Sequence, residues 1–356
     1  MQYHVITTER CNLRCTYCGG TRELPGLPLD IEYDIDVLRS FISEDPEAVI
    51  GFYGGEPLLA MDVLEAIMDR IPAKAFTLQT NGTLLHLLKD RYLHRLHSVL
   101  VSLDGPREVT DASRSDGIYD RVMENVSIVR SKGYKGDLIA RMAFSDLGDI
   151  HRDVSHLLKY FDHVHWQLDV FWTDLDARGD VEAWIDRYDE GITRLVSDFG
   201  TALEDGRVLG IVPFIPVLRT LITGTPVHIR CGSGIDSFSI MTSGSIEACP
   251  IAPELLYSNV GHISESTPPE ISNSRPIGPP CTDCDILWVC GGRCLFANQV
   301  EGWGRKWFDR ICSSTRHMIH ELSGLVPFAN DLIDRRVLPE DAFDYPELNN
   351  GSEIIP

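Results

Sequence analysis

The sequence predicts an α/β protein, a partial (β/α)6 barrel followed by a small cysteine-rich domain. Three observations support this fold class. Short β-rich runs alternate with helix-like stretches over the first two hundred residues, the alternation stops near residue 205, and seven of the ten cysteines lie between residues 231 and 312. Strands with continuous apolar runs that alternate with helices indicate a parallel sheet covered by helices. The expected parts are a core at 1–205, a connector at 206–230, the cysteine-rich domain at 231–325 and a tail at 326–356.

Six strand–helix units make up the predicted barrel, fewer than the eight of a closed one. Strands are expected at 3–8, 48–53, 75–80, 98–104, 138–144 and 163–171. Helices are expected at 34–44, 58–70, 83–93, 118–132, 149–160 and 180–203, the last with apolar residues near helical spacing. In such folds the active site forms at the carboxyl ends of the strands, where polar residues of this sequence gather.

Less regular structure is expected in the rest of the chain. Prolines punctuate the connector, residues 266–280 form a Pro/Ser-rich loop, and the acidic tail is expected to fray at its end, 347–356.

The negative net charge of the chain argues against two classes of binding partner. The chain has 53 acidic and 32 basic residues, a net charge of −21. Nucleic acids and anionic membranes both require a basic face, so neither partner is expected. A signal peptide and a long apolar span are both absent from the sequence, which makes a cytoplasmic location the expectation. In a reducing compartment, ten cysteines are better explained by metal binding than by disulfides.

Three cysteines crowd the loop after the first predicted strand. Cys11, Cys15 and Cys18 follow a C-x₃-C-x₂-C pattern. Thiolates at this spacing can hold one cubic iron–sulfur cluster, and three ligands for four irons leave one iron open for chemistry. The alternative is a zinc site of the three cysteines with His4 as the fourth ligand.

This loop resembles that of the radical S-adenosylmethionine (SAM) superfamily, and further motifs agree. "FYGGEP" ends the second strand, "LQTNGTLL" the third and "VSLDGP" the fourth, and "SRSDGIYDRVMENV" follows at 113–126. The last three motifs resemble the peptide-modifying branch of the superfamily. The resemblance implies a [4Fe–4S] cluster whose open iron binds SAM, which is then cleaved to a 5′-deoxyadenosyl radical.

The resemblance also implies candidate SAM contacts. Gly54 and Gly55 would allow close backbone approach to a ligand, Glu56 would accept a hydrogen bond from the SAM ammonium, and Tyr17 would lie beside the adenine. Arg141 is a cation inside an apolar strand, and the SAM carboxylate is a candidate partner for it. The remaining candidates for SAM or substrate contact are Gln79, Asn81, Ser102 and Asp104, for each of which turn or capping duty is the alternative.

The seven downstream cysteines resemble the SPASM domain of radical SAM enzymes that modify peptides and proteins. That resemblance implies two auxiliary [4Fe–4S] clusters, three clusters in all, with a pair of zinc sites as the alternative. An outer cluster would be held by four cysteines, Cys281, Cys284, Cys290 and Cys312. An inner cluster would be held by Cys231, Cys249 and Cys294. Some relatives close the inner cluster with an eighth cysteine that this sequence lacks, so we expect an open iron there or a non-cysteine ligand such as Asp236.

The expected activity is modification of a peptide or protein by thioether crosslinking or another oxidation. The chain is similar to a group of archaeal enzymes classed as peptide-modifying from such motifs. Formylglycine formation, as in anaerobic sulfatase maturation, is a second possibility, but Pro250 stands where that branch has an aspartate after the cysteine that corresponds to Cys249. An iron–sulfur electron carrier without SAM chemistry is a third, which the "GGE" motif disfavours.

The expected partners follow from that activity. A low-potential donor, ferredoxin or flavodoxin, would supply electrons. Because the cluster loop begins at Cys11, we expect neither a leader-recognition domain nor a cobalamin-binding domain before it. We then expect either that a separate protein recognises the peptide or that the peptide has no leader.

Overall fold

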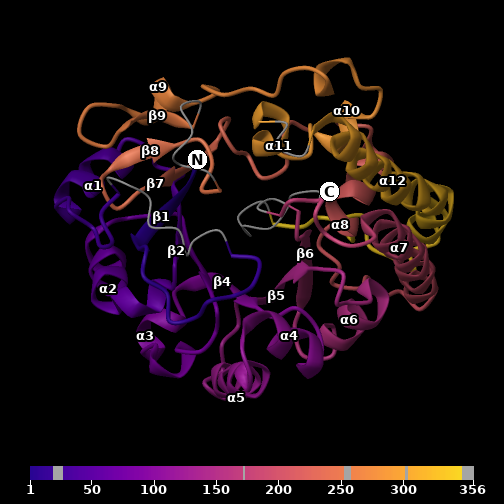
Figure 1. Ribbon diagram of the computed structural model, residues 1–356, viewed down its shortest axis with the longest axis horizontal. Helices are drawn as coiled ribbons and strands as arrows, with labels where there is room; N and C mark the ends of the chain where they lie inside the picture. Colours follow the sequence, from indigo (N-terminus) through magenta and orange to yellow (C-terminus); the bar gives the residue numbers. More distant parts are fainter. Residues whose placement is uncertain (19–26, 171–172, 252–257, 301–303, 347–356) are drawn as a thin grey trace.

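A nine-stranded open sheet forms the framework of the molecule in the computed structural model, which describes residues 1–18, 27–170, 173–251, 258–300 and 304–346. The strand order is β6-β5-β4-β3-β2-β1-β7-β8-β9. Figure 1 shows helices along the outside of the first six strands and the cysteine-rich segments gathered on one side. The predicted α/β fold with an incomplete barrel is therefore confirmed.

The first six strands are parallel and lie close to their predicted positions. They are β1 (Gln2–Thr8), β2 (Val49–Gly54), β3 (Ala75–Thr80), β4 (Leu96–Ser102), β5 (Asp137–Phe144) and β6 (His163–Leu168). The expected sixth strand is too long because β6 ends at Leu168, and its last residue, 171, lies outside the described part of the chain. Parallel pairing brings the carboxyl ends of these strands to one edge, as an active site in this fold requires.

Most predicted helices are present. The helical elements that cover the first six strands are α1 (Ile35–Ile42), the 3₁₀ turn η2 (Pro57–Ala60), α2 (Met61–Arg70), α4 (Arg107–Arg114), α5 (Ile118–Ser131), α6 (Ile150–Leu157) and α7 (Val181–Glu204). The short helix α4 was not predicted.

The helix expected at 83–93 is wrong. The 3₁₀ turn η3 (Leu85–Leu87) and the single helical turn α3 (Asp90–Leu93) stand there, separated by Leu88 and Lys89 with extended backbone. Leu85, Leu88 and Leu93 are all fully buried, so the apolar pattern reflects packing of a folded loop against the core.

The cysteine-rich half is joined to the core by the sheet itself. Strand β7 (Ser237–Ile240) pairs in parallel with β1, and β8 (Ser245–Glu247) and β9 (Asn259–His262) continue the sheet antiparallel. The short helical elements of this half are α9 (Pro268–Ile271), η4 (Cys281–Asp283), α10 (Leu287–Cys290) and α11 (Leu295–Val300). One hydrophobic core includes buried residues of both halves, from Tyr3 to Tyr345.

One helix lies inside the expected connector, and another crosses a boundary drawn from sequence. The expected connector contains α8 (Phe214–Thr223), whose residues Phe214, Val217 and Leu218 are fully buried. Helix α12 (Gly304–Asp334) runs through the boundary placed at residue 325 and packs on α7 and α8. The acidic end expected to fray, 347–356, lies outside the described residues. No helix within the described residues is both long and apolar enough to cross a membrane.

Candidate active site and auxiliary cluster sites

The three-cysteine loop follows β1 directly, at the carboxyl edge of the parallel strands. Cys11 and Cys18 are exposed and Cys15 is half-buried. Burial raises the pKa of the Cys11 thiol, and raises that of Cys15 to about 11. The charge of Cys18 contributes to both rises, so the three thiols are electrostatic neighbours.

Three soft sulfur donors on one loop can hold an iron–sulfur cluster or, with a fourth ligand, a zinc ion. His4, the fourth ligand in the zinc alternative, is buried in β1, where its Nε2 shares a 3.1 Å hydrogen bond with Ser237 Oγ. Among the described residues, no group of three or more His, Cys, Asp or Glu side chains is arranged to hold one metal ion. The three thiols are the kind of donor that the predicted cluster requires.

The glycines of the "GGE" motif bring β2 against the chain that enters the cysteine loop. A Cβ atom at Gly54 would lie 2.3 Å from the Thr8 carbonyl oxygen, and one at Gly55 would lie 2.3 Å from that of Arg10. The amides of Gly55 and Glu56 donate to these two carbonyls at 2.9 and 2.8 Å. We expected the glycines to approach a ligand, but the close approach in the structure is to the protein's own backbone.

Glu56 joins the ends of β2 and β3. Its side chain is fully buried, Oε1 accepts from Leu58 N at 3.1 Å and Thr80 Oγ1 at 2.7 Å, and Oε2 accepts from Asn81 N at 2.7 Å. Burial raises the pKa of this carboxyl, and the three hydrogen bonds oppose the rise. A carboxylate can accept about four hydrogen bonds, so Oε2 has capacity for one more, such as the expected SAM ammonium.

Asn81 connects β3 to the cysteine loop. Its Nδ2 donates to Asn12 Oδ1 at 2.8 Å and lies 3.9 Å from Cys11 Sγ. Its Oδ1 accepts from the amide and hydroxyl of Thr83. The expected contact residue therefore supports the first cysteine through Asn12.

Asp104 and Tyr17 form a buried network with Arg114, a residue that the sequence analysis did not single out. Arg114 donates Nε to Asp104 Oδ2 at 2.8 Å and Nη2 to Oδ1 at 2.9 Å. Asp104 also accepts from Tyr17 OH and from Ala143 N, both at 2.9 Å. These four bonds fill its acceptor positions, and Asp104 is 1% exposed, so its carboxylate is engaged within the protein. The expected contact of Asp104 with SAM or substrate stays a prediction.

The same network anchors the cysteine loop. The Arg114 guanidinium lies 5.4 Å from the centre of the Tyr17 ring, and the Thr16 amide donates to the Ser113 carbonyl at 2.9 Å. Burial is the largest cause of the raised pKa of Cys15, and the Arg114 charge opposes it. The motif "SRSDG" was visible in the sequence, but only the fold shows that its arginine lies beside the second cysteine.

The three other candidates lie half-buried near the carboxyl ends of their strands, with Gln79 on β3, Ser102 on β4 and Arg141 on β5. Ser102 pairs in register with Arg141 across the sheet. Arg141 Nη2 donates to Gln167 Oε1 at 2.7 Å, so a neutral side chain accepts one of its hydrogen bonds. An anionic partner for Arg141 remains a prediction.

The four cysteines assigned to the outer auxiliary cluster lie together. Cys281 begins η4, Cys284 follows it, Cys290 ends α10 and Cys312 comes from α12. Burial raises the pKa of the thiols of Cys281, Cys290 and Cys312, and each of these rises includes a contribution from another thiol of the set. Four thiols in mutual electrostatic contact fit a cluster with every iron held by cysteine.

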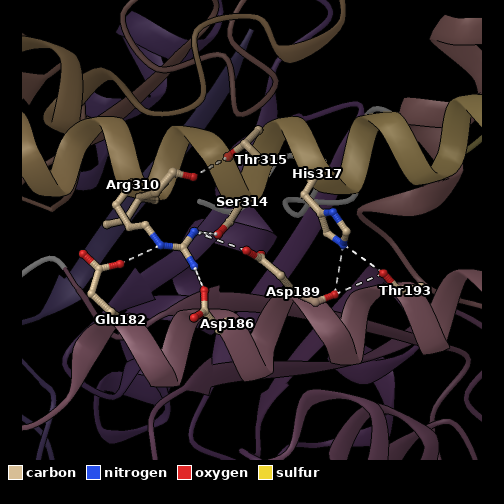
Figure 2. A network of polar contacts seen from close by, with 9 residues as sticks. Glu182, Asp186, Asp189, Thr193, Arg310, Ser314, Thr315 and His317 are labelled. Atoms are coloured by element: carbon tan, nitrogen blue, oxygen red, sulfur yellow. Dashed lines mark hydrogen bonds and ion pairs between the residues drawn. The ribbon is translucent and has the colours of Figure 1, made fainter.

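Helix α12 is held in place by an ion-pair network two residues from Cys312. Figure 2 shows Arg310 of α12 facing the acidic side chains of α7. Its three guanidinium nitrogens reach Glu182 at 3.0 Å, Asp186 at 2.7 Å and Asp189 at 3.2 Å. The Arg310 side chain is only 16% exposed. This network fixes the position of α12, and with it the one outer-set cysteine that is remote in sequence from the other three.

The three cysteines assigned to the inner cluster come from segments that converge. Ile229, Ala248 and Leu295 form a small separate core, against which Cys231 packs. Ala248 and Leu295 directly adjoin Cys249 and Cys294 in the chain. The Cys231 thiol is 3.3 Å from Ser233 Oγ.

Asp236, the expected non-cysteine ligand, has a half-exposed side chain. Its Oδ2 lies 3.6 Å from His228 Nε2. Coordination of the inner cluster by Asp236 remains a prediction.

Comparison with known proteins agrees with this arrangement. Residues 5–157 match the model of the radical SAM superfamily, so this part of the chain is a radical SAM domain. An uncharacterized protein of Methanothermobacter thermautotrophicus is 34% identical over 158 residues, 39% of this chain and 57% of that protein. A GTP 3′,8-cyclase of Marinobacter nauticus is 30% identical over 139 residues, 36% of this chain and 41% of the relative. The chain thus spans about half the length of these curated relatives.

Two solved structures share the fold at low sequence identity. Native anSMEcpe with bound AdoMet and Cp18Cys peptide has a TM-score of 0.70 and 20% identity, covering 93% of this chain and 99% of that one. Streptococcus suis SuiB bound to precursor peptide SuiA has a TM-score of 0.55 and 15% identity, covering 82% of this chain and 71% of that one. The first likeness extends well beyond the radical SAM domain.

Proposed function

We propose that the protein is a radical SAM enzyme that oxidises a peptide or protein substrate and carries two auxiliary [4Fe–4S] clusters in a SPASM-like domain. The observation that carries the proposal is the pairing of β7 with β1. Through this pairing, the strand that leads to the SAM-cluster loop and the cysteine-rich half share one sheet. The likeness to structures with bound peptides supports the substrate class.

Each group of site residues would have its own role in holding the cluster or contacting SAM and substrate. Cys11, Cys15 and Cys18 would hold the first cluster, which with bound SAM would supply a 5′-deoxyadenosyl radical able to remove a hydrogen atom from the substrate. Glu56 offers its remaining acceptor position to the SAM ammonium, and Arg141 offers its charge to the SAM carboxylate. Gln79 and Ser102 are further candidate contacts for SAM or substrate.

The proposed auxiliary clusters would accept one electron that thioether formation releases. Forming a thioether from a C–H and an S–H group removes two electrons and two protons from the peptide. One electron and one proton leave as the hydrogen atom taken into 5′-deoxyadenosine, the thiol gives up the second proton, and a one-electron acceptor takes the remaining electron. We assign that acceptor role to the auxiliary clusters, with Cys281, Cys284, Cys290 and Cys312 holding the outer one.

The inner site is proposed as the place where the substrate approaches metal. Cys231, Cys249 and Cys294 provide three thiolates for it, which leaves one iron for a substrate thiolate or for Asp236. A substrate thiolate there favours a thioether product. Formylglycine formation is less favoured because Pro250 occupies the position of the expected base.

The first test is the cofactor content. Anaerobic reconstitution should give about twelve irons per chain, from three four-iron clusters. The Cys11→Ala/Cys15→Ala/Cys18→Ala variant should retain about eight and lose 5′-deoxyadenosine formation from SAM and dithionite. A wild-type protein that holds all its iron and releases no 5′-deoxyadenosine would exclude SAM chemistry.

The second test is the substrate. Short peptides encoded beside the gene are incubated with enzyme, SAM and reductant, and their masses are measured. Loss of two hydrogens fits a crosslink or a desaturation, and thiol alkylation then shows whether a cysteine was consumed. GTP is assayed in parallel, and its conversion in the absence of peptide modification would overturn the proposed substrate class.

A further inference from the structure

Arg293 stands between the two auxiliary cysteine sets, in the sequence Cys290-Gly-Gly-Arg293-Cys294. It is only 3% exposed, and burial of a cation is costly. Its φ of +59° follows those of Gly291 at +72° and Gly292 at +93°. A side chain in this left-handed region costs about 1 kcal/mol that glycine avoids. A residue that is both charged and strained here points to a function that glycine could not supply.

The surroundings of Arg293 suggest that function. Its guanidinium carbon lies 5.1 Å from the centre of the Phe308 ring on α12. Phe308 precedes Cys312 by four residues, and residues at this spacing share one face of a helix. The buried cation therefore lies over the face of α12 that carries an outer-set ligand.

The Arg293 charge lies near three of the four outer-set cysteines, because it interacts electrostatically with Cys281, Cys290 and Cys312.

Arg316, another arginine near the outer set, is placed differently. It donates to Cys284 Sγ at 3.0 Å, but its side chain is 43% exposed and pairs with Asp285 at 2.6 Å. Water and a carboxylate both weaken the field of Arg316 at the cysteines. Arg293 is more deeply buried than Arg316.

We propose that Arg293 raises the reduction potential of the outer auxiliary cluster, and so favours it as an electron acceptor. The inference rests on the proposed assignment of Cys281, Cys284, Cys290 and Cys312 to that cluster. Reduction adds one electron and hence one negative charge, which a cation in a low-dielectric environment stabilises. Arg293 would act on the cluster through its field while the four cysteines hold the irons.

The experiment compares Arg293→Gln, Arg293→Gly and Arg293→Lys with the wild-type protein. Each is reconstituted on the Cys11→Ala/Cys15→Ala/Cys18→Ala background, which leaves only the auxiliary clusters. Iron is counted, and midpoint potentials are measured by EPR with dithionite as reductant. The signal lost in Cys312→Ser marks the outer cluster. Arg305→Gln is the matched control, because Arg305 also lies over Phe308, at 5.9 Å, but is 61% exposed.

We expect Arg293→Gln and Arg293→Gly to lower the reduced-to-oxidised ratio of the outer cluster about tenfold at a given potential, a shift of about 59 mV for one electron. Arg293→Lys and Arg305→Gln should stay near the wild-type value. An unchanged potential in Arg293→Gln with full iron content would overturn the proposal. Loss of the outer cluster in all three Arg293 variants would also overturn it, in favour of a structural role. Absence of any auxiliary signal in the parent protein would instead overturn the cluster assignment itself.

Discussion

Arg114 and Asp104 form a two-point ion pair inside the protein, with nitrogen–oxygen distances of 2.8 and 2.9 Å and side chains that are 6% and 0% exposed. The pair joins α4 to the segment that follows β4. Burial is the largest single cause and lowers the pKa of Arg114, but the charges of Asp104, Tyr17 and Cys15 and the hydrogen bond to Asp104 together outweigh it, so the net shift is upward. Tyr17 donates to the same carboxylate, so the ion pair also holds in place the part of the cysteine loop around Tyr17.

Breaking this pair should weaken both the fold and the first cluster. Arg114→Met leaves the Asp104 charge buried without its cation, which typically costs about 3–5 kcal/mol. We expect that loss in the free energy of unfolding of the apoprotein, measured by denaturant titration, and a fall of about four irons after reconstitution.

The control for this prediction is the surface ion pair of Arg107 and Asp120, whose side chains are 57% and 56% exposed. Arg107→Met should cost less than about 1 kcal/mol. Equal losses from the two arginine variants would contradict a special role for Arg114.

The Glu56 carboxylate should stabilise the folded protein even when SAM is absent. In Glu56→Gln, the new amide nitrogen would face either the Asn81 amide or the two donors at Oε1, which pairs donor with donor. We expect a loss of about 1–3 kcal/mol in the free energy of unfolding without SAM. SAM affinity of the folded fraction, measured by equilibrium dialysis, should also fall.

Glu47→Gln serves as the comparison, since Glu47 is 68% exposed and pairs with Lys74 on the surface. It should change stability by less than about 0.5 kcal/mol. A Glu56→Gln protein as stable as wild type would show that the three internal hydrogen bonds contribute little.

Arg310 should control the occupancy of the outer auxiliary cluster. Arg310→Met leaves Glu182, Asp186 and Asp189 facing one another without the cation, so α12 should shift on α7 and displace Cys312. We expect iron to fall from about twelve to about eight per chain, with SAM cleavage largely kept. Arg335→Met, at the residue just after this helix and at a 64% exposed surface pair with Asp331, should keep all the iron. Full iron in Arg310→Met would refute the link between helix docking and the cluster.

His4 should make the protein less stable in mild acid. Burial lowers the pKa of His4 to about 4, against about 6.5 in an unfolded chain. The unfolded state therefore binds the proton more tightly, so stability is complete above pH 6.5 and falls between pH 6.5 and 4. The loss is on the order of 3 kcal/mol, and below pH 4 this contribution levels off.

The measurement is denaturant unfolding of the apoprotein at a series of pH values. His4→Gln should flatten the profile between pH 6.5 and 4. His86→Gln, which removes an exposed imidazole, should leave the profile as in wild type. An unchanged slope in His4→Gln would show that the loss arises elsewhere.

Sequence periodicity located five of the six predicted strands to within about two residues at most of their ends, because buried parallel strands are continuous apolar runs. It failed at 83–93, where apolar residues at helical spacing pack from a broken loop. It also missed the continuation of the sheet through β7, since the pairing of Ser237–Ile240 with β1 depends on contacts more than two hundred residues apart.

The sequence identifies motifs more readily than the contact partners of individual side chains. The "GGE" motif was found, but the sequence could not show that Gly54 and Gly55 abut Thr8 and Arg10. The family resemblance makes Asp104 a candidate ligand contact, whereas in the structure Arg114, Tyr17 and Ala143 use its four acceptor positions. Hydrogen-bond partners are chosen by the fold, and a strand-end position alone cannot reveal whether they come from the protein or from a ligand.

The fold class and the radical SAM motifs can be predicted from the sequence alone, because they depend on residue type and on short separations along the chain. The folded structure was needed to show that Arg114 supports the cysteine loop, that Arg310 docks α12 near Cys312, and that Arg293 is buried over Phe308. Charges far apart in sequence interact only once the chain has folded, and burial then sets the strength of that interaction.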